Sequence, residues 1–148
     1  MKTLLLFICL LLAASLLPVK QASSQSITGV WKGKIGSART EVKLIKKGDS
    51  LLGTSYYFSS AKSYRRYSVK GYFDPETNEV IWWDDALLED FGNPGPNNAL
   101  LAVADFNCPG ENDMRLDGTT TARDDKNIIR GNVQLQKVAR AAFPDEWD

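Results

Sequence analysis

The stretch that decides the fold is IRGNVQLQ at positions 129–136, in which apolar or small residues alternate with polar ones. A period of two is the pattern of a β-strand that buries one face and exposes the other. The same alternation surrounds Trp31, where the segment 27–35 reads ITGVWKGKI. Both segments, one near each end of the chain, are therefore predicted to form half-buried strands.

Further strands are predicted between these two, separated by turn-forming residues. They are expected at 41–45, 52–58, 67–73, 80–83, 99–106 and 114–118. Turns are expected at 48–50, 74–78 and 107–110, a helical turn at 86–91, and a long loop of Gly, Pro and Asn at 92–98. About eight short strands joined by hairpin-length turns indicate an all-β protein, a single antiparallel meander. Closing that meander into an up-and-down barrel removes its two edges, and a two-sheet β-sandwich is the alternative.

The first residues have the pattern of a secretory signal peptide. Lys2 supplies a positive start, an apolar run of about 14 residues follows, and Ala22-Ser23-Ser24 offers small residues for cleavage before Gln25. The run is shorter than the roughly 20 residues that span a bilayer. We therefore expect an exported protein, periplasmic or extracellular, with a signal peptide at 1–24, a barrel domain at 25–138 and a tail at 139–148. The tail is expected to form either a short helix or an extended docking segment.

The chain contains no histidine. This excludes Ser-His-Asp and Cys-His nucleophile pairs and zinc sites built on histidine. Cys9 falls within the expected signal peptide, so Cys108 is left as an inert thiol or one that pairs between chains, and no internal disulfide is expected. These features favour a protein that is not an enzyme and holds no cofactor.

Two acidic segments are candidate sites. The cluster at 84–90 could supply paired carboxylates for glycoside hydrolysis, but a solvated charged turn is the simpler interpretation. The segment 105–113 is similar to a calcium loop, yet Pro109 stands where such loops place an oxygen ligand. We therefore expect neither catalytic residues nor a metal site.

Charge is spread unevenly along the chain, although the net charge is zero. Basic side chains are concentrated between 32 and 70, and acidic ones between 74 and 117. One interpretation is that neighbouring strands carry complementary charge. The other is a two-sided surface that orients a partner. Nucleic acid is not an expected partner, because there is no net basic charge.

Aromatic residues give the best indication of function. Trp31 is expected to point inward as a structural barrel plug, with Arg130 or Lys137 over its face. Alternation splits Trp82 and Trp83 between the two faces of their strand. The residues expected to bind a ligand or partner are Tyr64, Arg66, Tyr72, Trp82 and Trp83, with the outward set formed by Tyr64, Arg66, Tyr72 and whichever Trp shares their face. Cross-strand aromatic pairing that only stabilises the sheet is the alternative.

The opening Ile27-Thr28-Gly29-Val30-Trp31 resembles the first strand of lipocalins, fatty-acid-binding proteins and avidins, in which Gly-x-Trp begins an eight- to ten-stranded barrel. The order of Gly53-Thr54, a Tyr-rich segment and 67–74 also resembles avidins. The resemblance implies a lipocalin- or avidin-like barrel, of the kind found in uncharacterised exported bacterial domains. It does not imply biotin binding, because Gly33 and Ser55 replace the Asn and Tyr that bind biotin in avidins.

We therefore expect a non-catalytic exported binding protein. It would hold a small apolar or sugar-like ligand in the barrel mouth, or a protein partner or glycan on its aromatic face. The alternative is a structural or accessory subunit of a bacterial envelope complex without a ligand. A cavity lined by aromatic side chains would favour a ligand, and a filled barrel would favour the subunit.

Overall fold

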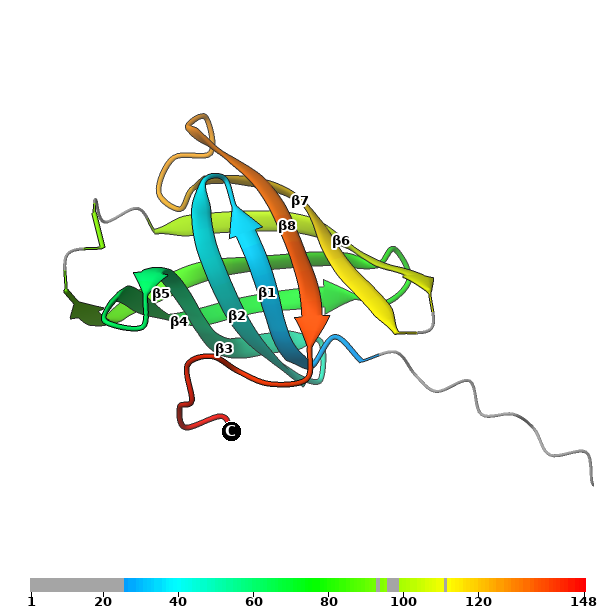
Figure 1. Cartoon of the computed structure of the whole chain (residues 1–148). Helices are drawn as coiled ribbons and strands as arrows, with labels where there is room; N and C mark the ends of the chain where they lie inside the picture. Colours follow the sequence, from blue (N-terminus) through cyan, green and yellow to red (C-terminus); the bar gives the residue numbers. More distant parts are fainter. Residues whose placement is uncertain (1–25, 93, 96–98, 111) are drawn as a thin grey trace, which may run out of the picture.

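Eight antiparallel strands follow one another around a closed barrel in the computed structural model (Figure 1). It describes residues 26–92, 94, 95, 99–110 and 112–148, so the expected signal peptide lies outside the described residues. The strands are β1 (Gly29–Ile35), β2 (Ala38–Lys47), β3 (Ser50–Ser60), β4 (Ser63–Asp74), β5 (Glu79–Phe91), β6 (Leu100–Gly110), β7 (Asp113–Ala122) and β8 (Ile129–Val138). The prediction of an all-β meander is confirmed.

Pairing of the first and last strands closes the barrel, so the sandwich alternative is wrong. β1 pairs with β8 from Val30 opposite Val138 to Ile35 opposite Val133. Gly33 makes this approach possible, since a Cβ atom there would lie 2.1 Å from the backbone oxygen of Gln134. The closed eight-stranded architecture fits the barrel shared by lipocalins and avidins.

Two local expectations were wrong, because backbone partners were available across the sheet. Residues 86–91 form the end of β5 rather than a helical turn, since β4 extends far enough to pair Tyr64 with Phe91. Residues 107–110 continue β6 rather than turning. Pro109 lies where the β6–β7 register shifts, a position at which a strand tolerates proline. Residues 93 and 96–98 of the expected loop lie outside the described residues.

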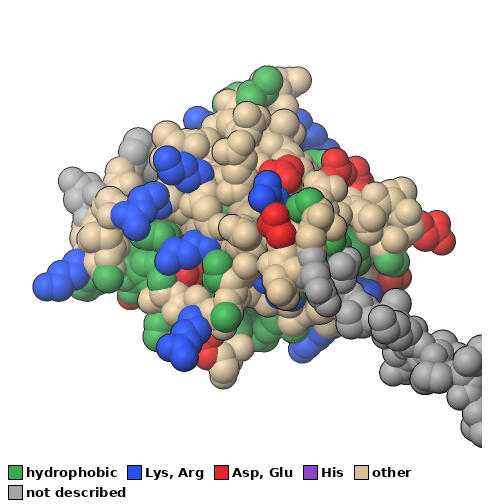
Figure 2. Space-filling view, turned by 45° about the vertical axis from the view of Figure 1, so that its right-hand side comes forward, with side chains coloured by type: hydrophobic (Ala, Val, Ile, Leu, Met, Phe, Trp, Pro, Cys, Tyr) green, Lys and Arg blue, Asp and Glu red, His purple; other side chains and the backbone are tan. Residues whose placement is uncertain are grey.

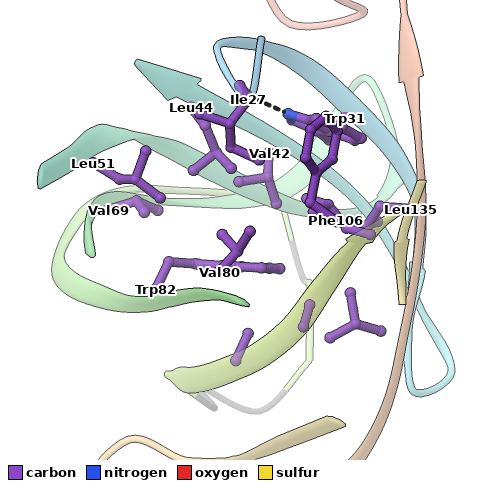
Figure 3. Packing of buried hydrophobic residues seen from close by; sticks show 14 of the residues in the cluster. Ile27, Trp31, Val42, Leu44, Leu51, Val69, Val80, Trp82, Phe106 and Leu135 are labelled. Carbon is purple, nitrogen blue, oxygen red and sulfur yellow. Dashed lines mark hydrogen bonds between the residues drawn. The ribbon is translucent and has the colours of Figure 1, made fainter. Parts of the chain in front are cut away.

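Trp31 closes one end of the barrel interior, as expected (Figure 3). It is fully buried, its indole N–H donates to the Ile27 carbonyl oxygen at 3.0 Å, and its ring meets Phe106 edge-on at 5.8 Å. The cation over the Trp31 ring is Lys137, whose Nζ lies 5.9 Å from the ring centroid. Apolar side chains from several strands fill the space beneath, so this end of the barrel has a packed core.

The opposite end of the barrel carries four connections, because β1, β3, β5 and β7 all run towards it. The first is the turn after β1, where Gly36 has a φ of 59°. A Cβ atom on Gly36 would lie 2.8 Å from the backbone oxygen of Arg130, so only glycine fits here without displacement. This contact holds the β1–β2 turn against the start of β8 at the rim of the barrel.

The tail at 139–148 is an extended docking segment, the second of the two expected forms. It lies against the outer face of the barrel beside β3 (Figure 1). The carboxylate of Glu41, which is fully buried, accepts hydrogen bonds from the backbone N–H groups of Ala142 at 2.8 Å and Phe143 at 3.1 Å. A buried carboxylate with two such partners is stabilised where it lies. The Phe143 ring stacks on Tyr56 at 4.7 Å.

A buried ion pair fixes the end of the tail. Lys43 Nζ lies 3.0 Å from Asp145 Oδ1 and 2.9 Å from Asp148 Oδ1. The hydroxyl groups of Thr54 and Tyr56 donate to Asp145 at 2.8 and 2.7 Å. Burial opposes ionisation of Asp145, but these hydrogen bonds and Lys43 hold its pKa below the usual value. The tail is therefore an integral part of the folded barrel.

The charged residues pair locally while their signs remain segregated. Lys70 pairs with Asp85 across the β4–β5 junction at 2.9 Å. In Figure 2, most Lys and Arg side chains lie on one half of the visible face and most Asp and Glu side chains on the other. Both interpretations of the charge pattern thus have support. In the part of the chain described here, no helix has the length and apolar character needed to cross a membrane.

Candidate functional site

A pocket of about 540 Å³ opens at the end of the barrel opposite Trp31. Its lining comes from all four connections at this end: the β1–β2 turn, the β3–β4 end of the sheet, Pro94 between β5 and β6, and the start of β8. The lining residues are Ile35, Ser37, Ala38, Arg39, Tyr57, Phe58, Ser59, Arg65, Tyr67, Pro94, Leu100 and Arg130. A volume of this size falls within the range of small-molecule sites, about 300–1,000 Å³.

The inner part of the pocket is apolar and aromatic. Ile35, Tyr67 and Leu100 are buried, and Tyr57 is half-buried. The rings of Tyr57 and Tyr67 meet edge-on, with centroids 6.0 Å apart. These residues lie on the inward face of their strands. Tyr67 stands opposite the buried Ser55, and Ile35 stands opposite Ala38 of the pocket lining. The pocket is therefore the unfilled upper part of the barrel interior.

A buried carboxylate lies directly behind this aromatic wall. Asp84 is fully buried and accepts three hydrogen bonds: from the Ser55 hydroxyl at 2.6 Å, the Tyr57 hydroxyl at 2.9 Å and the Leu100 N–H at 2.9 Å. Burial raises its pKa to about 6, although the three hydrogen bonds and nearby Arg123 oppose the rise. Asp84 thus positions two lining residues, Tyr57 and Leu100.

Three arginines bring positive charge to the pocket. Arg65 is buried, and its guanidinium contacts Asp90 and the Gly95 carbonyl oxygen, each at 2.9 Å. Arg39 is exposed, lies over the Phe58 ring at 4.8 Å and donates to the Ser59 carbonyl oxygen at 3.2 Å. Arg130 is exposed at the start of β8. Among the described lining residues none is acidic.

Two of the residues expected to bind a partner are in contact with the chain's own tail. Tyr64 packs against Phe143 with ring centroids 5.1 Å apart, and its hydroxyl donates to Glu89 at 2.7 Å. Arg66 forms an ion pair with Glu146. Both side chains face outward, as alternation indicated, but the tail occupies the space in front of them.

The other three expected binding residues are divided between the two faces. Tyr72 and Trp83 lie outside, meet edge-on at 6.4 Å, and Tyr72 is 48% exposed. Trp82 is 1% exposed in the barrel core, where it stands opposite Gly71 (Figure 3). Trp83 is therefore the tryptophan that shares the outward face, and the five residues do not form one site.

The acidic cluster at 84–90 is not the solvated turn that the sequence suggested. It lies on β5, where Asp84 is buried inside and Asp85 faces outward and pairs with Lys70, while Glu89 and Asp90 are exposed. Within the described residues, no group of three or more His, Cys, Asp or Glu side chains could hold a metal ion. Cys108 is half-buried, and burial raises the pKa of its thiol.

Strand alternation in the sequence contains a signal for part of the pocket. Arg65 lies two residues from Tyr67, and Asp84 lies two residues from Trp82, so alternation places each of them on the same inward face as that aromatic residue. Both charged side chains were therefore predictable as interior residues. The rim could not be found in this way, because Arg39 and Arg130 stand near strand ends and only barrel closure brings them together.

Comparison with protein-family models finds no match, and neither do comparisons with curated proteins and with solved structures. The geometry of the pocket is therefore the basis for assigning a function.

Proposed function

We propose that the protein is a non-catalytic binding protein that holds a small apolar or ring-bearing ligand in the mouth pocket. The observation that carries the proposal is the pocket itself: an open volume of about 540 Å³ above a packed barrel core, with Tyr57 and Tyr67 in its wall. Concave sites with aromatic walls and a few fixed polar groups are typical of ligand binding.

The pocket walls are held in place by buried contacts, which supports binding without large rearrangement. Tyr57 and Leu100 are both fixed by Asp84, and Arg65 by Asp90. Pre-organised side chains lose little conformational entropy when a ligand binds. A lipocalin- or avidin-like role, with export to the periplasm or the extracellular space, is part of the same proposal and agrees with the signal-peptide pattern at 1–24.

A second candidate is a protein partner on the outer face of β4 and β5. One observation favours it, because Tyr72 is 48% exposed beside Trp83. Tyr64 and Arg66 contribute less to this surface than the sequence suggested, since Phe143 and Glu146 already contact them. An envelope subunit without a ligand would use such a surface and leave the pocket empty.

Filling the pocket tests the proposal. Ala38 is half-buried in the lining, so Ala38→Trp would place an indole ring in the ligand space. Fluorescence titration with the neutral dye N-phenyl-1-naphthylamine is expected to show binding to the wild type and binding at least about tenfold weaker to Ala38→Trp. Gln134→Trp is the matched control, because Gln134 is exposed on the outside of β8.

Thermal melting of all three proteins checks that each one folds. The proposal fails if the folded wild type binds no dye, or if Ala38→Trp and Gln134→Trp bind it equally well. Native mass spectrometry of protein purified from its own source then distinguishes the two candidates, since a small-molecule adduct supports the pocket and a second polypeptide supports the outer face.

A further inference from the structure

We infer that the ligand of the mouth pocket is an anion, a carboxylate- or sulfonate-type group carried on an apolar, ring-bearing body. The inference rests on the proposed function and specifies its ligand class. It also gives the ligand an orientation: the apolar body lies inward against Tyr57 and Tyr67, and the anionic group lies at the rim near Arg39 and Arg130.

The rim carries two arginines, Arg39 and Arg130, that form no ion pair among the described residues, although Asp124 and Asp125 line a neighbouring hollow with Arg130. Arg39 donates to a carbonyl oxygen and covers an aromatic ring, and neither contact cancels its charge. The ion pairs found in the described residues include neither Arg39 nor Arg130. Like charges gathered at the mouth of a cleft with low-dielectric walls attract an ion of opposite sign.

Charge deeper in the pocket is already balanced. Arg65 pairs with Asp90 at 2.9 Å, and the oxygens of Asp84 accept hydrogen bonds from Ser55, Tyr57 and Leu100. A ligand cation would therefore meet three guanidinium groups before it reached a carboxylate whose acceptor positions are occupied. An anion at the rim with a neutral body below fits both parts of the lining.

Two dyes that share one ring system test the ligand class directly. 8-Anilinonaphthalene-1-sulfonate is N-phenyl-1-naphthylamine with an added sulfonate, so the comparison isolates the anionic group. The wild type is expected to bind the sulfonate dye more tightly than the neutral dye. Arg39→Gln and Arg130→Gln should each weaken sulfonate binding by about three- to tenfold and leave binding of the neutral dye within about twofold.

Lys32→Gln is the matched control, since Lys32 is an exposed cation on the outside of β1 and does not line the pocket. Weaker binding of both dyes to Ala38→Trp shows that both occupy the pocket, and thermal melts show that the variants fold. Equal affinity for the two dyes, with no effect of the arginine variants, overturns the anion inference and leaves the proposed function standing. An equal loss of sulfonate binding in Lys32→Gln also overturns it, because general surface charge would then be the cause. Failure of both dyes to bind overturns the proposed function as well.

Discussion

Replacing Asp84 with Asn should remove a pH-dependent destabilisation of the fold. Asp84 is fully buried, and its pKa is raised from 3.8 to about 6 by burial. An asparagine can keep all three contacts: its oxygen accepts from Tyr57 and Leu100, and its amide group donates to Ser55, whose hydroxyl then accepts. The substitution therefore removes the charge and leaves the packing unchanged.

The sign of the effect follows from proton linkage. Because the folded state holds the Asp84 proton more tightly than the unfolded state does, the free energy of unfolding falls as the pH rises from about 4 to about 6. At about 1.4 kcal/mol for each pH unit, the loss in the wild type is about 3 kcal/mol by pH 7. Asp84→Asn should show no such loss and should be about 1–3 kcal/mol more stable than the wild type at pH 7, after allowing for altered hydrogen bonds.

Urea unfolding curves at pH values from about 4.5 to 7.5 measure this. No histidine titrates in this pH range, because the chain contains none. Asp145 and Asp148, whose pKa values are lowered by their hydrogen bonds, lose their contribution to stability only as the pH falls below about 4. Asp85→Asn is the matched control, since Asp85 lies next in the chain on the outer face. A decline in wild-type stability that persists in Asp84→Asn, or that disappears in Asp85→Asn, would refute the assignment.

Three further predictions concern the rest of the chain. Trp31→Ala should lower the free energy of unfolding by about 3–5 kcal/mol, because it empties the closed end of the core, and an unchanged denaturation midpoint would contradict this. Lys43→Ala should cost about 3–5 kcal/mol because it leaves Asp145 buried without its cation, whereas the exposed Lys32→Ala should cost less than about 0.5 kcal/mol in the same melts. N-terminal sequencing of the protein exported by its own source should begin at Gln25, and recovery of an intact Met1 from the exported fraction would refute the signal peptide.

The barrel was predictable because the alternation of neighbouring residues along each strand indicates which side chains face inward. Alternation sets the face of residues 131–136 in β8, and the same rule places Trp31 inward in β1. The expected inward position of Ile129 was wrong: it is 79% exposed, at the point where the β7–β8 register shifts. The strand ends were less predictable. Residues 86–91 contain no clear alternation, and they become a strand only because β4 continues alongside them. Such pairing depends on a distant segment, which local pattern does not reveal.

The site was harder to predict than the fold, because it depends on contacts between distant segments. Alternation correctly predicts that Tyr64 and Arg66 face outward, but it does not reveal that the tail lies over them. The rim includes Arg39 and Arg130, which are far apart in the sequence and line one pocket only because β1 pairs with β8. Asp84 was grouped with the solvated acids beside it, although it alternates in step with Trp82, and its register opposite Val69 places it in the interior.

Amide NMR spectra recorded during a titration with N-phenyl-1-naphthylamine test the central claim most directly. If the mouth pocket is the ligand site, the largest chemical-shift changes should occur at Ala38, Tyr57 and Leu100, which line it from three strands. Changes confined to Tyr72 and Trp83 would place binding on the outer face of β4 and β5 and contradict the account, and a titration without any shift changes would contradict it equally.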